Sequence, residues 1–445
     1  MDLGDKLSLY SSTSQEKKAS AKKQPLQGPG IGRESDNEEV AFRIGDSSTG
    51  MEIVFQRLEG DLYFRRVFYE DLEFGNRRLA ESLRGLVCNI DELVGRSAAR
   101  EGGLIHREEV LFLDTETTGL QRGPGNFPFL FGLAYFRGDS MVFEQYFLDG
   151  PGGEEAFQSV LRQIVSRFAA ICTYNGKSFD IPVIKNRFIL LGDRFRAPAI
   201  HLDLYHFWKS LRGGSRRKGF KQKDLEEELL GFVRVDDLPG SEVPQTYFDY
   251  RKYGKKDGLG RVFQHNEWDL QGLTMLFLEA SRALESEKDQ SAVVRSGIAR
   301  MFVRRGKVAQ GKTILEELSS LNNYDSELLY SDRLLLAFLL KREHLYEESH
   351  QRFLVLARDY GCIQSHIEAS RHLEHRLRDI AGALALVEDA QRLVERMDES
   401  SVSGSLPTET RRAGLRKNRW MEDLVKRKSR LVRKQEQSQK RTASK

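Results

Sequence analysis

The chain has 445 residues, of which 39% are hydrophobic and 31% charged, and a formal net charge of +4, values that indicate a globular protein of two or three domains. Its three cysteines, Cys88, Cys172 and Cys362, lie far apart, which excludes a disulfide framework or a cysteine zinc site and favours a reducing compartment. Because no apolar run approaches membrane-spanning length and the N-terminus lacks the apolar core of a secretion signal, we expect a soluble cytoplasmic protein with no membrane partner.

The N-terminal part of the chain divides into two segments. Residues 1–40 are rich in Ser, Lys, Gln and Gly and poor in large apolar side chains, so this segment is expected to be disordered. Residues 41–105 are expected to form an extension of the next domain. Within it, the pattern of residues 51–74 predicts two short strands around a glycine-containing turn, and helical spacing follows from Leu79 to Val94.

Residues 106–284 contain an ordered set of strands and helices. Apolar and alternating runs predict five strands, near residues 111–116, 128–136, 141–148, 169–174 and 200–204. Helical periodicity marks residues 154–168, a helix from Phe179, and the remainder of the block as far as Leu284. Three strands in a meander followed by βα units predict an α/β domain with a mixed five-stranded sheet flanked by helices.

Residues 290–398 are predicted to be helical throughout. Three segments resemble one another, and the small residues that open their second helices, Gly311, Ser349 and Ala383, are spaced near the tetratricopeptide period of about 34 residues. We therefore expect tetratricopeptide-like helical repeats that offer a surface to a protein partner; a plain helical bundle is the alternative.

The C-terminal segment, residues 399–445, is strongly basic. From Arg411 onward it has 14 Lys and Arg residues against three acidic residues. It is expected to be a disordered tail that holds a polyanion through its phosphates, although a solvated tail without a partner fits the composition equally well.

Two acidic side chains follow the first strand of the central block. The apolar run Leu111–Leu113 predicts a buried strand, and Asp114 and Glu116, two residues apart, then point to the same face. Two carboxylates crowded together repel each other unless a cation lies between them. The pair therefore indicates half of a divalent-metal site.

Further candidates lie at helix starts. Asp180 follows a strand at the point where the chain turns into a helix, next to the edge where α/β folds place their sites. His265 and Asp269, four residues apart in the expected opening turns of the last helix, share a face. Taken singly, Asp180 and Asp269 could instead be helix caps, and His265 a capping or outer-sphere residue.

The ordered motifs Asp-x-Glu, Asn-x-x-x-Phe-Asp and His-x-x-x-Asp resemble those of the DEDD superfamily of 3′–5′ exonucleases on the ribonuclease-H-like fold. More narrowly, the chain resembles the YprB-type ribonuclease-H-like family over about residues 106–284, and its helical tail resembles that of some members. The shared elements are Tyr174–Asp180, His201–Leu204, Leu238–Gly240 followed by Pro244 and Tyr247, and His265-Asn266 before Asp269.

The resemblance implies a divalent-metal-dependent nuclease, expected to be a 3′–5′ exonuclease on single-stranded DNA or RNA. Asp114, Glu116, Asp180 and Asp269 would bind two Mg²⁺ or Mn²⁺ ions ~4 Å apart, one lowering the pKa of a water and the other stabilising the leaving oxygen. A non-catalytic nucleic-acid-binding or scaffold protein that retains the fold is the alternative.

His265 would take the place of the general base in this resemblance. Histidine-type members carry their His five residues before the last Asp and tyrosine-type members carry Tyr four residues before it, so the four-residue spacing here departs from both patterns. The pocket for the terminal nucleotide would be lined by Thr117, Thr118, Gly119 and Asn175.

A basic loop supplies the remaining substrate contacts. Seven cations lie between Lys209 and Lys223, and we expect Arg216, Arg217 and Lys218 to contact the phosphate backbone while Trp208 and Phe220 offer stacking surfaces. A solvated basic loop is the alternative. His201, His206 and Asp203 are expected to be structural, because no ligand spacing involves them.

Overall fold

The computed structural model describes residues 41–45, 52–95, 105–119, 125–212, 219–321, 326–396 and 407–443. The disorder predicted for residues 1–40 and the predicted contacts of Arg216, Arg217 and Lys218 lie outside these ranges. The chain divides into two compact units, Met1–Asp289 and Gln290–Lys445, and each is described by itself.

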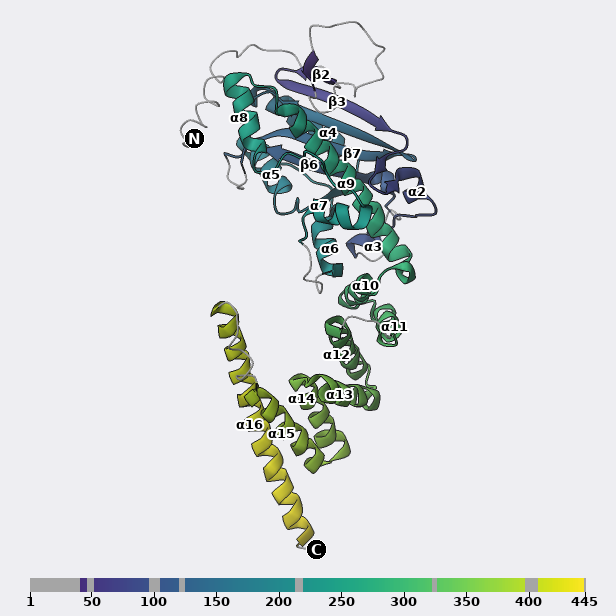
Figure 1. The fold of residues 1–445 in the computed structure, drawn as a ribbon, viewed down its shortest axis with the longest axis vertical. Coiled ribbons are helices and arrows are strands. Elements are labelled where there is room, and N and C mark those ends of the chain that lie inside the picture. The colour runs from purple at the N-terminus through teal and green to yellow at the C-terminus, as the bar shows by residue number, and fades with distance from the viewer. Residues whose placement is uncertain are drawn as a thin grey trace. The chain divides into compact units, whose positions relative to one another are not determined.

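The first unit is built on a sheet with the strand order β1-β2-β3-β8-β7-β6-β9-β10 (Figure 1). Strands β6, β9 and β10 are parallel, and the other neighbours pair antiparallel. The strands are β1 (Ala41–Gly45), β2 (Glu52–Glu59), β3 (Leu62–Tyr69), β6 (Val110–Thr117), β7 (Pro128–Arg137), β8 (Ser140–Leu148), β9 (Ala170–Thr173) and β10 (Ile200–Asp203), with a separate two-stranded pair, β4 (Glu73–Phe74) and β5 (Arg77–Arg78).

The predicted α/β class and mixed sheet are confirmed, but the predicted count of five strands is too low. Strands β6 to β10 are the five that the sequence indicated, and β3 of the N-terminal extension pairs with β8 from Leu62 to Tyr69. An unpaired β8 would expose a row of backbone N–H and C=O groups. The extension satisfies that edge and enlarges the sheet to eight strands.

Helices cover both faces of this sheet. Helix α9 (Leu259–Glu285) packs on one face, where its Phe277 meets Phe112 of β6 with ring centroids 5.2 Å apart. On the opposite face, Phe157 of α4 (Glu154–Val165) stacks on Phe131 of β7 at 3.7 Å. The remaining helices of this unit are α2 (Leu79–Leu83), α3 (Ile90–Val94), α5 (Asp180–Leu190), α6 (Leu204–Arg212), α7 (Gln222–Leu225) and α8 (Val243–Tyr253).

Gly132 of β7 lets α9 lie close to the sheet. A Cβ atom at this position would stand 2.4 Å from Asn266 Oδ1 and 2.6 Å from Leu270 Cδ1 of α9. Since no side chain fits in that space, glycine sets how closely α9 approaches the strands. The polar side chains of α9 are thereby brought against the end of β6.

The second unit consists of the helices α10 (Ala292–Arg304), α11 (Val308–Ser319), α12 (Ser326–Arg342), α13 (Tyr346–Tyr360), α14 (Ile363–His372), α15 (Ile380–Arg396) and α16 (Pro407–Ala443). The three small residues singled out in the sequence are buried between successive helices. Ser349 Oγ donates to Ala337 O, and Ser370 Oγ donates to Ala383 O, each at 2.9 Å. The helical character is confirmed; the tetratricopeptide class and the protein partner stay predictions.

The prediction of a disordered tail is wrong for residues 407–443, which form α16. Leu424 and Leu431 are fully buried and pack in one cluster with Val387 and Val394 of α15. Seven residues, about two helical turns, separate these leucines, so both lie on one face of the helix. The overall basic composition of the segment gave no indication that these two leucines would anchor a helix.

No helix within the described ranges is both long and apolar enough to cross a membrane. The cytoplasmic location stays a prediction.

Candidate active site

Strand β6 carries the first two acidic residues on the face that α9 covers. Phe112, Asp114 and Glu116 alternate onto this face, and Asn266 of α9 donates from Nδ2 to Asp114 Oδ2 at 2.8 Å. Asn266 in turn accepts a hydrogen bond at Oδ1 from Gln145 Nε2 at 3.1 Å. A chain of amide groups thus fixes the orientation of the Asp114 carboxylate.

Asp180 is the first residue of α5 and reaches the same place from the other side of β6. Thr115 Oγ1 donates to Asp180 Oδ1 at 2.6 Å. Because Thr115 lies between Asp114 and Glu116, its side chain points to the opposite face of the strand. The hydrogen bond therefore holds Asp180 at the end of β6, beside the two strand carboxylates.

Asp269 lies on the third turn of α9, which begins at Leu259, and not in the opening turns as predicted. A capping role is thereby excluded for it. Arg234 Nη2 donates to Asp269 Oδ1 at 2.6 Å, and the same guanidinium makes two hydrogen bonds to Glu226, at 2.9 and 2.8 Å. Only 4% of the Arg234 side chain is exposed, so Asp269 is held by a buried and doubly anchored cation.

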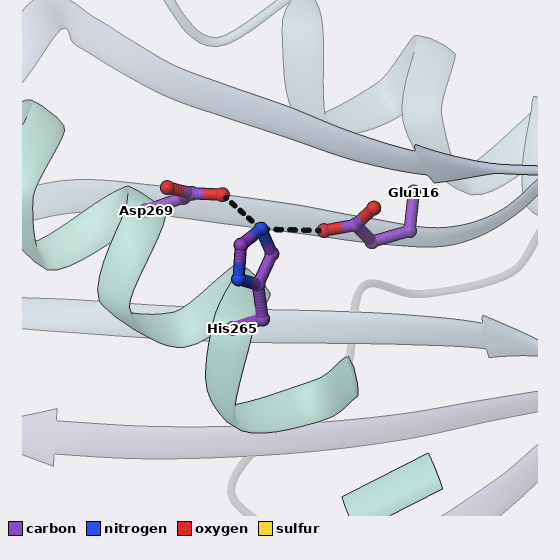
Figure 2. Close-up of side chains that lie close together, drawn as sticks. All are labelled: Glu116, His265 and Asp269. Atoms are coloured by element: carbon purple, nitrogen blue, oxygen red, sulfur yellow. Dashed lines mark ion pairs between the residues drawn. The ribbon is translucent and has the colours of Figure 1, made fainter. Parts of the chain in front are cut away.

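Figure 2 shows His265 and Asp269 extending from α9 toward Glu116 of β6. His265 Nε2 lies 3.3 Å from Asp269 Oδ2 and 3.8 Å from Glu116 Oε1. The other ring nitrogen, Nδ1, is hydrogen-bonded to Asp237 Oδ1 at 2.5 Å. Asp237 therefore fixes the ring so that Nε2 faces the carboxylates, and the position deep within α9 excludes a helix-capping role for His265.

Burial and mutual repulsion shift the pKa values of these groups. Burial raises the pKa of Asp114 well above its usual range, with further increases from Asp269, Asp180 and Glu116. Burial also raises the pKa of Glu116 to about 8, against the opposing effect of His265. It raises the pKa of Asp180 to about 6, although the hydrogen bond from Thr115 opposes that change.

The pKa of His265 is shifted in the direction that favours the charged imidazolium form. Burial alone would lower its pKa, but the charge of Asp269 and the hydrogen bond to Asp237, with Glu116 adding to them, raise the pKa to about 10. Negative charge thus exceeds positive charge here, and the imidazolium supplies part of the compensation. Divalent cations bound among these carboxylates would remove the cause of the shift.

The donor set fits a hard divalent ion. Carboxylate oxygens are the ligands that Mg²⁺ and Mn²⁺ prefer, and Asp114, Glu116 and Asp269 converge here. The ligand atoms of Glu116, His265 and Asp269 lie within 4.8 Å of one another, the one such trio found in the described part of the chain. Asp114 and Asp180 complete the arrangement, since both contribute to the electrostatic shifts at the site.

A cavity of about 760 Å³ opens beside these carboxylates. Asp114, Glu116 and Asp180 are among the residues that line it. Four aromatic side chains also line it, and one of them, Phe179, is 45% exposed. They are Tyr174, Phe179, Tyr205 and Phe220.

The structure separates the predicted substrate residues. Thr117, Gly119 and Asn175 line the cavity, as does Phe220. Thr118 is 4% exposed and exchanges hydrogen bonds with Phe127, so it is a structural residue of the β6–β7 connection. Trp208 is 2% exposed and packs in the core through α6, which makes the predicted stacking role wrong.

Asp203 and His201 have structural roles, in line with expectation. Asp203 accepts hydrogen bonds from the backbone N–H groups of Asn175 and Lys177, at 2.8 and 3.1 Å. Asn175 has a φ of +61°, a left-handed conformation that asparagine tolerates better than most residues. Asp203 therefore holds the loop that precedes Asp180. His201 Nε2 lies 2.8 Å from Thr173 Oγ1.

Sequence reasoning missed Arg234, Asp237 and Glu226. They lie between the basic loop and α8, in a segment expected to be helical. Glu226 begins the π-helical turn η4 (Glu226–Leu230), but residues 231–242 form no helix, so the helical prediction is wrong there. The run Arg234-Val-Asp-Asp237 contains the only hint: Val233 and Val235 are 65% and 72% exposed, so the alternation turns the polar Arg234 inward.

Two comparisons with known proteins show which family the chain resembles. A family model of the RNase H superfamily matches residues 111–280, a span that contains every carboxylate described above. The chain is 32% identical over 304 residues to a Bacillus subtilis (strain 168) protein named "Uncharacterized protein YprB". The aligned region covers 64% of this chain and 70% of the relative. The chain belongs to the YprB family of ribonuclease-H-like proteins.

Membership of the RNase H superfamily suggests a nuclease, that is, a hydrolase acting on nucleic acid at an acidic metal site. The B. subtilis relative is itself uncharacterized, so family membership shows the fold, and the superfamily suggests the class of chemistry.

Proposed function

We propose that the chain is a metal-dependent nuclease that degrades single-stranded nucleic acid from the 3′ end. The observation that carries this proposal is the convergence of Asp114, Glu116, Asp180 and Asp269 at one end of β6, with His265 Nε2 3.3 Å from Asp269. Two ions, when bound, would lower the pKa of an attacking water and stabilise charge on the leaving oxygen.

The protein side chains around the reacting groups have distinct tasks in this proposal. His265 accepts the proton of the water at Nε2, because Asp237 occupies Nδ1 and sets which nitrogen is available. Arg234 and Asn266 hold the carboxylates of Asp269 and Asp114 in place. Thr117 Oγ1 donates to Gly119 O at 2.8 Å and keeps the turn after β6 compact beside the cavity.

The aromatic lining of the cavity supports a single-stranded substrate. Unpaired bases can stack on exposed rings, a contribution of ~1–3 kcal/mol per base, and Phe179 offers such a ring next to Asp180. Lys221 lines the same cavity and provides a cation for the phosphate backbone. A base held in a duplex would be unable to reach these rings without leaving its stack.

Polarity and substrate class are tested together with one set of oligonucleotides. DNA and RNA strands of equal sequence are labelled at the 5′ end and incubated with the chain in Mg²⁺ or Mn²⁺, with a free or a chemically blocked 3′ end. The proposal predicts a ladder that shortens from the 3′ end and stops when that end is blocked. Equal cleavage of blocked and free strands would indicate an endonuclease instead.

A further inference from the structure

The second unit contains a cavity of about 240 Å³ between α12, α13, α14 and the turn η6 (Leu373–Leu377). Sites for drug-sized molecules enclose ~300–1,000 Å³, so this cavity suits a smaller group. Its lining is rich in basic side chains. They are Lys341, His350, Arg371, His372, His375 and Arg376.

His350 has an unused hydrogen-bonding group in this lining. The residue is 4% exposed, and its ring stacks on His372 with centroids 4.3 Å apart. Its Nδ1 atom is buried and has no hydrogen-bond partner within the described ranges. An unpaired buried polar group destabilises the folded chain, so a ligand that engages this nitrogen would recover that free energy.

The permanently charged side chains of the cavity have N–H donors that are not used in ion pairs. Arg376 lies over the ring of Tyr346, 3.6 Å from its centroid, and no ion pair to it is found within the described part of the chain. Lys341 and Arg371 share a single carboxylate, that of Glu368. Since lysine has three N–H donors and arginine has five, most of their donors remain free for an anion.

A metal ion fits this cavity poorly, although histidines line it. Among the described residues, no trio of metal ligands lies here, and three permanent cations, Lys341, Arg371 and Arg376, would repel a divalent ion. Planar guanidinium groups beside an ammonium group are typical of phosphate recognition. Charge and geometry therefore favour an anion.

We propose that this cavity binds a phosphoryl group, held by Arg376, Lys341 and Arg371 and hydrogen-bonded by His350. The phosphoryl group would belong to a nucleotide or to the phosphorylated end of a nucleic acid. The inference does not depend on the nuclease activity proposed for the first unit, because every residue in it lies in the second.

Calorimetric titration of the full-length chain tests the assignment. Divalent ions are first removed by dialysis, so that phosphate has no metal to bind in the first unit, and inorganic phosphate is the probe. Arg376→Gln should weaken phosphate binding about tenfold, the effect of one lost charge-assisted hydrogen bond of ~1.5 kcal/mol. Arg358→Gln, at a 75% exposed side chain paired with Asp359, is the matched control and should change nothing.

A second variant should act in the opposite direction. Glu368→Gln removes the carboxylate that competes for Lys341 and Arg371, and it should tighten phosphate binding several-fold. Circular dichroism confirms that each variant is folded. The assignment is overturned if the wild-type chain does not bind phosphate, or if Arg376→Gln binds it as tightly as the wild type does.

The source of the phosphoryl group is read from a short oligonucleotide with a 5′ phosphate or a 5′ hydroxyl. Tighter binding of the phosphorylated strand, lost in Arg376→Gln, supports a nucleic-acid end. Binding of a nucleoside monophosphate without discrimination between the two strands supports a free nucleotide. Discrimination that survives Arg376→Gln contradicts the proposal.

Discussion

Asp237 fixes the orientation of the His265 ring in the site. Its carboxylate holds Nδ1 at 2.5 Å and leaves Nε2 between Asp269 and Glu116. Asp237 does not reach the carboxylates of β6 itself. A change at this position should therefore separate the orientation of the imidazole from the binding of metal.

Asp237→Asn should lower the cleavage rate ~10–100-fold, the usual cost of losing such an orienting group. Mn²⁺ affinity, measured by calorimetry, should change far less, because all four carboxylates remain. Asp236→Asn is the control: this neighbour is exposed, and its side chain takes no part in the site. Equal activity of Asp237→Asn and Asp236→Asn would contradict the role given to His265.

Burial of the carboxylates also predicts how stability changes with pH. The pKa values of Glu116 and Asp180 are raised on folding, to about 8 and about 6. The folded state therefore binds protons more tightly than the unfolded state, and the stability that this provides is lost as the pH rises through those values. The pKa of His265, raised to about 10, extends the same trend to higher pH.

We accordingly expect the metal-free chain to melt at a lower temperature near pH 8 than near pH 5.5. Mn²⁺ should raise the melting temperature more at the higher pH, because fewer protons compete with the ion for the carboxylates there. The measurement is the Mn²⁺-induced shift in melting temperature at both pH values. Glu116→Gln should reduce the shift at the higher pH. An undiminished shift in Glu116→Gln would mean that Mn²⁺ binds elsewhere.

The geometry of the site depends on how closely the helix α9 packs against the sheet. Asn266 touches Asp114, and the same residue lies against Gly132 of β7. A methyl group at position 132 would displace α9 at the turn that carries Asn266.

Gly132→Ala should destabilise the chain by ~1–3 kcal/mol through overpacking, measured by urea denaturation. Metal affinity should fall as well, since Asp114 would lose its fixed orientation. Gly45→Ala provides the comparison, because a Cβ at Gly45 meets nothing within 4 Å. Equal unfolding free energies for the two variants would show that the close approach of α9 is not needed.

Local patterns of the sequence were sufficient for the five central strands and for the carboxylates of β6. Asp114 and Glu116 follow an apolar run and repeat at the strand period, so their common face could be predicted. The ion pair between Arg234 and Asp269 joins residues 35 positions apart, and the pairing of β3 with β8 spans a larger separation. Neither leaves a local periodic pattern, so both required the three-dimensional structure.

At the scale of the whole molecule, the chain joins an acidic α/β unit to a helical unit that ends in the basic helix α16. Arg419, Lys426 and Arg433 of α16 are exposed and recur every seven residues, which puts them on one face of the helix. Glu374 of the π-helical turn η6 pairs with other cations of α16, at 2.6 Å from Arg430 and 2.8 Å from Lys434. The exposed face is left for solution or for a polyanion.

If this face contacts nucleic acid, a triple change of Arg419, Lys426 and Arg433 to Gln should weaken binding and make it less sensitive to salt. Each phosphate contact contributes a slope of about −0.7 on single strands, so the slope should fall in magnitude by about 2. A control triple change to Gln at the exposed Arg84, Arg137 and Arg358 should leave it unchanged. An unaltered slope in the α16 variant would show that this helix has no contact with phosphate.

We propose above that the carboxylates at the end of β6 form a nuclease centre. The most direct measurement is cleavage of end-labelled single-stranded DNA and RNA in Mg²⁺ and Mn²⁺ by the wild type, by Asp114→Asn, and by Asp139→Asn at an 81% exposed surface carboxylate. A nuclease centre at these carboxylates predicts that the wild type and Asp139→Asn degrade the strand, and that Asp114→Asn binds it without cleaving. Intact strands with the wild type in both metals, or undiminished cleavage by Asp114→Asn, would contradict it.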